Sequence, residues 1–275
     1  MGKFDGVLIC TDLDGTLLKN DKSISQENLD AIEYFKSEGG FFTFVTGRMP
    51  HTSAKTCETV KPNAPFGCIN GGGLYDYEKK QYIVTSILPE EGMTLVKLVD
   101  EKLPQVGFLV NTFYKTYFCK KNDAMENFRV RVGAPDTSGV YNEIDEPVAK
   151  VVFATDSESE MAELERVLRS HPLADRFDFM RSEQTLFEIL PKDTNKGNSI
   201  EGLCKYLGID KRRTIAVGDY NNDVAMLKEA GVGIAVANAC ENAKAAADII
   251  TVSNEEHAIA QIINDIETGK IKCIL

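Results

Sequence analysis

The sequence predicts an α/β protein with a parallel-sheet core into which a second, α+β domain is inserted. Strand-like and helix-like segments alternate at both ends of the 275-residue chain, as in a parallel sheet with crossover helices. Between about Thr85 and Pro191 the pattern changes to neighbouring strand-like runs with interspersed helices, and the alternation then resumes. We therefore expect residues 1–84 and 191–275 to form one domain, interrupted by a domain at 85–190.

The first block opens with the apolar run Val7–Cys10, typical of a parallel strand that is buried on both faces. A helix is expected over Ser23–Gly39, because apolar residues recur there near helical spacing and glycines end the segment. The β-branched and aromatic run Phe41–Arg48 predicts a second strand. A helix at about Pro50–Val60, a short strand and the glycine-rich loop Asn70–Gly73 should follow.

The two later blocks are interpreted in the same way. In the middle block we expect helices at 90–103 and 157–169, a strand hairpin at 107–113 and 115–121, and strands at 148–155, 177–181 and 185–190. In the last block we expect helices at 196–207, up to 230 and at 241–247, and strands at 214–217, 233–237 and 248–251.

Asp12 and Asp14 lie where the first predicted strand ends, in the run Asp-Leu-Asp-Gly-Thr. Ligands of open α/β sheets bind outside the carboxyl ends of the strands, so both carboxylates lie where a ligand-binding site is expected. Two carboxylates so close repel each other unless a cation intervenes, and Mg²⁺ is the natural candidate. The alternative is an ordinary turn in which Asp14 and Thr16 cap backbone amides.

Three further groups are predicted at the same edge of the sheet, each at a strand end or a helix start: Thr46-Gly47, Lys196, and Gly218-Asp219 with Asn222 and Asp223. Their chemistry is complementary. The acidic side chains suit a metal ion, whereas Thr46, the Gly47 amide and Lys196 offer hydrogen bonds and positive charge to an anion. A phosphoryl group between the metal and the lysine satisfies both sets.

This arrangement suits phosphoryl transfer. Asp12 could attack phosphorus without a base, because a carboxylate is ionised at neutral pH and Lys196 and the metal neutralise the approach of two anions. Asp14 could protonate the leaving oxygen and later deprotonate the water that opens the aspartyl-phosphate.

These motifs make the chain resemble the haloacid dehalogenase (HAD) superfamily, in particular its Cof-like, type IIB phosphatases. The resemblance rests on the D-x-D-G-T run, Thr46, a distant Lys196 and the acidic run GDYNND at 218–223. It implies a HAD-like, Rossmann-like parallel-sheet core, with the middle segment as an inserted α/β cap domain.

The resemblance also implies roles for individual residues. Asp12 would be the nucleophile and Asp14 the general acid/base. Mg²⁺ would be bound by Asp12, the Asp14 backbone carbonyl and Asp219, and the remaining residues would bind the phosphate or support the site: Thr46, Gly47, Lys196, Asn222 and Asp223. Arg48 could reach the substrate or be structural, and the triglycine loop after Asn70 could lie near the ligand or be a flexible turn.

Composition narrows the possible partners. A formal net charge of −11 argues against sequence-independent binding to nucleic acid or to anionic membranes. No apolar run approaches the length of a membrane span, and the first residues lack the apolar region of a signal peptide. Seven cysteines without a C-x-x-C pair fit a reducing, cytoplasmic location. We expect a monomer or weak homodimer.

We thus expect an Mg²⁺-dependent phosphatase that acts on a small phosphorylated metabolite, with sugar phosphates as the first class to test. Three alternatives stay open. They are a phosphomutase of the same fold, a phospho-acceptor protein in which the aspartyl-phosphate persists, and a non-catalytic metabolite-binding protein.

Overall fold

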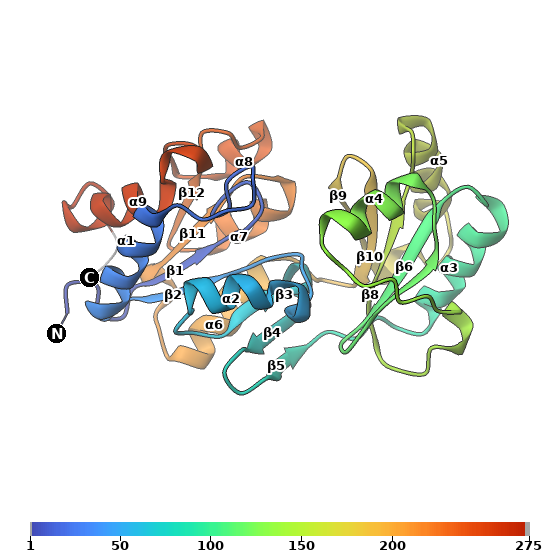
Figure 1. Ribbon diagram of the computed structural model, residues 1–275, viewed down its shortest axis with the longest axis horizontal. Coiled ribbons are helices and arrows are strands. Elements are labelled where there is room, and N and C mark those ends of the chain that lie inside the picture. Colours follow the sequence, from blue (N-terminus) through green and yellow to red (C-terminus); the bar gives the residue numbers. More distant parts are fainter. Residues whose placement is uncertain (1, 273–275) are drawn as a thin grey trace. The chain divides into compact units, whose positions relative to one another are not determined.

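The computed structural model describes residues 2–272, and within them the chain forms two compact units (Figure 1). One unit is the continuous segment Thr85–Thr194. The other combines the residues before this segment with those that follow it. The chain therefore leaves the first unit and returns to it, so residues far apart in sequence share one core.

The discontinuous unit is built on a five-stranded parallel sheet in the order β13-β12-β11-β1-β2. Its strands are β1 (Leu8–Thr11), β2 (Phe41–Phe44), β11 (Thr214–Gly218), β12 (Val232–Ala235) and β13 (Ile249–Ile250). Every residue of β1 is buried, which agrees with the apolar run expected of a strand covered on both faces. The central pair β1–β11 joins the first block of the chain to the last.

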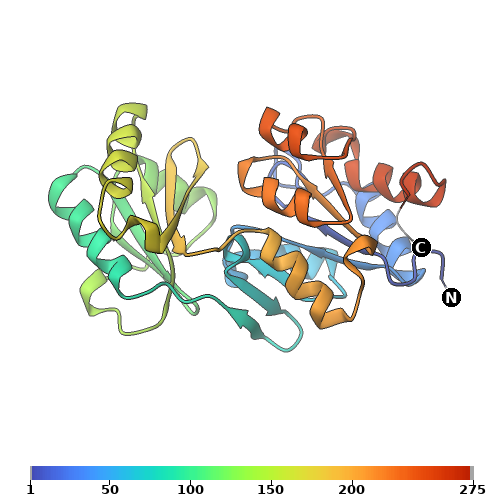
Figure 2. The ribbon, with the colours of Figure 1, turned by 180° about the vertical axis from the view of Figure 1, so that it is seen from behind.

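Helices cover this sheet: α1 (Gln26–Ser37), α2 (Ala54–Val60), α6 (Gly197–Leu207), α7 (Val224–Glu229), α8 (Glu241–Ala246) and α9 (Ala258–Glu267). The Ser25 side chain caps α1 by accepting from the Asn28 amide, and Gly208 ends α6 in the left-handed conformation. Helices α1 and α9 come from opposite ends of the sequence but pack side by side (Figures 1 and 2). Helix α9 was not expected from the sequence.

A small three-stranded sheet extends the same unit, in the order β3-β4-β5: β3 (Phe66–Cys68), β4 (Gly73–Asp76) and β5 (Gln81–Thr85). It begins next to the main sheet, because Gly67 makes a parallel bridge with Val45 just beyond β2. Only β3 was expected from the sequence. The chain that follows β3 forms a tight left-handed turn at Ile69–Gly71, and β4 begins at the last glycine of the triglycine run.

The inserted unit contains a five-stranded antiparallel sheet in the order β7-β6-β8-β10-β9. Its strands are β6 (Gly107–Thr112), β7 (Thr116–Lys120), β8 (Val148–Ala154), β9 (Phe177–Glu183) and β10 (Leu186–Pro191). Its helices are α3 (Glu91–Lys102), α4 (Asp123–Arg131) and α5 (Glu158–Arg169). The expected hairpin is β6–β7, whereas α4 was not anticipated. The predicted α/β fold class, with a separate α+β unit, is confirmed.

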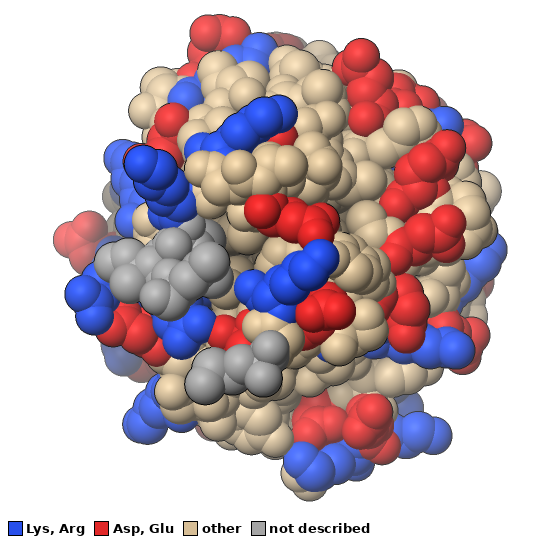
Figure 3. All heavy atoms as spheres, turned by 90° about the vertical axis from the view of Figure 1, so that its left-hand side faces the viewer, with Lys and Arg blue, Asp and Glu red and all other residues tan. Residues whose placement is uncertain are grey.

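Three further features concern membrane-spanning helices, cysteines and surface charge. No helix among residues 2–272 is both long enough and apolar enough to cross a membrane. The six cysteines in this range are free thiols, and Cys273 lies outside the described residues. The face in Figure 3 carries acidic and basic side chains interspersed with one another.

Candidate active site

Asp12 begins the loop after β1 and is held from the neighbouring strand, since its amide donates to the Val217 carbonyl at 2.8 Å. The loop turns back at Gly15, whose φ of +85° is strained for residues with a side chain. A Cβ at Gly15 would also lie 2.5 Å from Asp219 Oδ2. Glycine at this position therefore allows the loop to close against the aspartate that follows β11.

Lys196 immediately precedes α6, and its side chain is fully buried between two carboxylates. Its Nζ lies 2.5 Å from Asp12 Oδ1 and 2.6 Å from Asp223 Oδ1. Burial alone would lower the pKa of Lys196, but the charges and hydrogen bonds of Asp12 and Asp223 outweigh it and raise the pKa. Lys196 is therefore a buried cation whose two ion pairs join three segments of the chain.

Asp219 and Asp223 lie in the turn after β11. Asp223 Oδ2 accepts from the amides of Asp219 and Tyr220, which fixes the turn, and Asp219 Oδ1 accepts from Thr16 Oγ1 at 2.7 Å. Asp12, Asp219 and Asp223 each offer an oxygen within 4.8 Å of the others. Among residues 2–272, no hydrogen bond is donated to Oδ2 of Asp12 or of Asp219.

The electrostatics of these three aspartates fit a bound cation. Burial raises the pKa of Asp12 well above its ordinary value, even though Lys196 opposes this effect. Burial, and next the Asp223 carboxylate, raise the pKa of Asp219 to about 6. The cluster thus has three carboxylates but one lysine, which contacts two of them. A hard divalent ion with oxygen ligands would remove the remaining repulsion.

The side chain of Asp14 points to other partners. Its carboxylate accepts from Nε and Nη2 of Arg48 at 2.8 and 2.7 Å, and from Lys22 Nζ at 2.8 Å. Burial tends to raise the pKa of Asp14, but Arg48 and Lys22 outweigh it and lower the pKa to about 2. The expected metal contact of Asp14 involves its backbone carbonyl and stays a prediction. Arg48, whose role the sequence left open, is an ion-pair partner of Asp14.

Thr46 and Gly47 follow β2 on the same side of the unit. Thr46 is buried, its amide donates to the Gly67 carbonyl, and its Oγ1 accepts from the Arg48 amide. Asn222 Nδ2 donates to Asn70 Oδ1 at 3.2 Å, which brings the triglycine segment to the site. Two residues in the site had not been singled out from the sequence, Lys22 and Asn70. The Asn-Gly-Gly-Gly run was a signal for Asn70, whereas nothing in the sequence marked Lys22.

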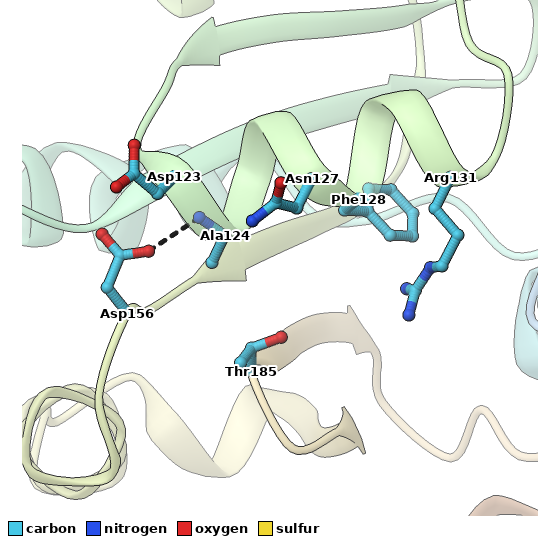
Figure 4. Close-up of a pocket in the computed structure, with 7 residues that line it drawn as sticks. All are labelled: Asp123, Ala124, Asn127, Phe128, Arg131, Asp156 and Thr185. Atoms are coloured by element: carbon cyan, nitrogen blue, oxygen red, sulfur yellow. Dashed lines mark hydrogen bonds between the residues drawn. The ribbon is translucent and has the colours of Figure 1, made fainter.

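A cavity of about 380 Å³ lies elsewhere, wholly within the inserted unit (Figure 4). It is lined by α4 and two neighbouring loops, through Asp123, Ala124, Asn127, Phe128, Arg131, Asp156 and Thr185. Two of its charged groups already have local partners, because Asp156 accepts from the Ala124 amide and Arg131 pairs with Glu183. It contains none of the residues expected to act in phosphoryl transfer.

Known proteins resemble the chain over nearly its whole length. The family described as haloacid dehalogenase-like hydrolase matches residues 9–263. The Bacillus subtilis (strain 168) protein named 5-amino-6-(5-phospho-D-ribitylamino)uracil phosphatase YitU is 26% identical over 262 residues, covering 94% of this chain and 96% of that protein. The Arabidopsis thaliana protein named endoribonuclease YBEY, chloroplastic, is also 26% identical over 266 residues, or 93% of this chain, but the chain spans only 45% of it.

Solved structures share the fold. A haloacid dehalogenase-like hydrolase from Bacteroides thetaiotaomicron superposes with a TM-score of 0.83 at 26% identity, covering 94% of this chain and 99% of that one. A protein described as the HAD subclass IIB sugar phosphatase BT4131 gives a TM-score of 0.82 at 21% identity, covering 96% of this chain and all of that one.

Proposed function

Since this chain belongs to the haloacid dehalogenase-like hydrolases, we propose that it is an Mg²⁺-dependent phosphatase of small phosphorylated metabolites that works through an aspartyl-phosphate. The observation that supports this proposal most strongly is the buried Lys196 shared by Asp12 and Asp223 beside Asp219. A lysine and an acidic cluster together can accommodate a metal ion and an anion at one place. The names of its relatives also support a phosphatase activity.

In the first half-reaction an oxygen of Asp12 forms a bond to phosphorus while the bond from phosphorus to the leaving oxygen breaks. Asp14 donates a proton to that oxygen. In the second half-reaction Asp14 takes a proton from water, the water oxygen forms a bond to phosphorus, and the bond from phosphorus to Asp12 breaks. Inorganic phosphate and the free carboxylate of Asp12 result. Lys196 donates a hydrogen bond from Nζ to Asp12 Oδ1. It thereby orients the nucleophile and offsets its negative charge as the phosphate approaches.

Other side chains bind and orient the phosphate in this proposal. Thr46, Gly47, Lys196 and Asn222 would donate hydrogen bonds to its oxygens, while Asp223 holds Lys196 in place. Asp12, the Asp14 carbonyl and Asp219 would hold Mg²⁺, which supplies positive charge to the phosphate when bound. The carboxylate of Asp14 must break its contacts with Arg48 and Lys22 and contact the substrate before it can carry a proton. This follows because these two cations keep the carboxylate ionised.

The segment Thr85–Thr194 would act as the cap domain that selects the leaving group and excludes water. We propose sugar phosphates and related polyol phosphates as the substrate class. The relative YitU supports this choice, since its named substrate carries phosphate on a ribityl chain.

A panel of phosphorylated metabolites, assayed for released phosphate with Mg²⁺ and with EDTA, tests this function. We expect turnover on several sugar or polyol phosphates with Mg²⁺ and none with EDTA. Transfer of phosphate to another position of the substrate without its release would instead identify a phosphomutase. A stable phosphoprotein without turnover would identify a phospho-acceptor.

Metal binding should depend on pH. In the metal-free protein the raised pKa of Asp219, about 6, favours folding at low pH, and this contribution is lost as pH rises from about 4 through 6. Mg²⁺ requires the ionised carboxylate, so protons compete with it at low pH. We expect saturating Mg²⁺ to raise the thermal midpoint by on the order of 5 °C at pH 7.5 and by much less at pH 5.

Differential scanning fluorimetry with Mg²⁺ and with EDTA measures this difference. Asp219→Asn, which cannot ionise, should lose most of the Mg²⁺ effect at both pH values. An equal Mg²⁺ effect at pH 5 and pH 7.5 would contradict the assignment of Asp219 as a ligand.

A further inference from the structure

The turn Ile69–Gly71 between β3 and β4 has an unusual backbone. Ile69, Asn70 and Gly71 all have positive φ, at 57°, 53° and 95°. Glycine adopts this region freely and asparagine tolerates it, but it is unfavourable for a β-branched residue such as isoleucine. Such a conformation persists only where surrounding contacts impose it, and it is often found at functional sites.

The contacts that hold this turn come from segments of the proposed phosphate site. The Asn70 amide donates to the Thr46 carbonyl and the Ile69 amide to the Arg48 carbonyl, both at 3.1 Å. On its other side, a Cβ at Gly71 would lie 1.9 Å from the Asn195 carbonyl oxygen, so the turn packs directly against the residue before Lys196. The turn thus packs against two of the segments that would hold phosphate, the one that contains Thr46 and the one that contains Lys196.

The Asn70 side chain reaches a third segment. It is 1% exposed, and its Oδ1 accepts from Asn222 Nδ2 at 3.2 Å. A Cβ at Gly47 would lie 2.8 Å from the same Oδ1, so glycine at position 47 makes room for this amide. The Nδ2 group of Asn222 carries two hydrogens, and the bond to Asn70 uses one and fixes the direction of the other.

We propose that Asn70 is a positioning residue for the phosphate site. Its backbone and its buried side-chain amide hold Thr46, Gly47 and Asn222 in place. This inference rests on the proposed phosphatase function and deepens it. Asn70 acts through these neighbours and takes no part in bond making. Without its amide, Asn222 is free to rotate and the phosphate loses a preorganised donor.

Asn70→Gly tests the proposal because glycine keeps the left-handed backbone and removes only the side chain. We expect kcat/KM to fall by about 10-fold to 100-fold. The binding of inorganic phosphate, measured from the thermal shift it causes in the Mg²⁺-loaded protein, should weaken by a similar factor. Asn70→Ser, whose hydroxyl is too short to replace the amide, should behave alike and serves if the glycine variant folds poorly.

A matched control is Lys61→Gly. Lys61 is another left-handed residue of the same unit, at the end of α2, and it is exposed. This variant should leave kcat/KM and phosphate binding unchanged.

Asn222→Ala provides the second arm of a double-mutant cycle. If Asn70 acts through Asn222, Asn70→Gly should cost much less in the Asn222→Ala background than in the wild type. An Asn70→Gly protein that melts at a lower temperature but keeps the wild-type kcat/KM and phosphate affinity would overturn the inference. So would a double variant whose loss of kcat/KM equals the product of the losses in the two single variants. A wild-type protein that releases phosphate from no compound with any divalent ion would refute the phosphatase function instead.

Discussion

Asp12→Asn is expected to lower phosphate release by at least about a thousandfold, because an amide cannot act as the nucleophile that attacks phosphorus. The substitution preserves the shape of the side chain, and its oxygen can still accept from Lys196 Nζ. Lys196 also keeps Asp223 as a charged partner, so the fold should tolerate the loss of the Asp12 charge. Steady-state phosphate release at saturating Mg²⁺ and the thermal midpoint measure the two effects.

Asp210→Asn is the matched control for this variant. Asp210 is an exposed aspartate paired with Arg212, far along the sequence from Asp12 and in no contact with the acidic cluster. Its replacement should leave turnover within about twofold of wild type. Undiminished turnover in a purified, folded Asp12→Asn protein would rule out Asp12 as the nucleophile.

Lys196→Met is expected to have the largest combined effect on stability and activity. The lysine is fully buried, so its loss leaves Asp12 and Asp223 facing each other without a cation. Removing one partner of a buried ion pair typically costs about 3–5 kcal/mol of unfolding free energy. Phosphate release should fall by at least about a hundredfold, since the site loses both a donor and the charge that offsets the nucleophile.

Urea unfolding and phosphate release separate these two effects, because activity can be measured under conditions where the variant remains folded. Lys205→Met is the control, since Lys205 lies in the last turn of the same helix and is exposed. It should change the unfolding free energy by less than about 0.5 kcal/mol. A Lys196→Met protein as stable as the control would contradict the description of Lys196 as the buried counter-ion of both aspartates.

Features that depend on strand order could be predicted from the sequence. The apolar runs identified β1 and β11, and parallel neighbours present their carboxyl ends at one edge. The juxtaposition of Asp12 with Asp219 follows from that rule, and the structure brings both to one cluster. The same reasoning placed Lys196 at this edge, and its Nζ lies 2.5 Å from Asp12 Oδ1, but its burial was not predicted.

Other features depend on side-chain geometry that leaves no periodic signal. Asp14 pairs with Arg48 and with Lys22, and Lys22 has a left-handed backbone. No spacing rule indicates either pair. Helix α4 buries only Ala124 and Met125 of its residues, so its apolar pattern is too sparse to recognise. Strand β4 begins at Gly73, and its first residues read as a flexible loop.

The pairing of β1 with β11 affects how the chain can fold while it is being synthesised on the ribosome. Thr16 and Asp219, which meet through a hydrogen bond, are separated by 203 positions. At bacterial or eukaryotic synthesis rates this separation corresponds to roughly 10–40 s of translation. During this time β1 can pair with β2 but not yet with β11, the other of its two neighbours in the described sheet. A nascent chain, or one truncated before Thr214, presents an apolar strand edge that invites aggregation and is a natural target for chaperones.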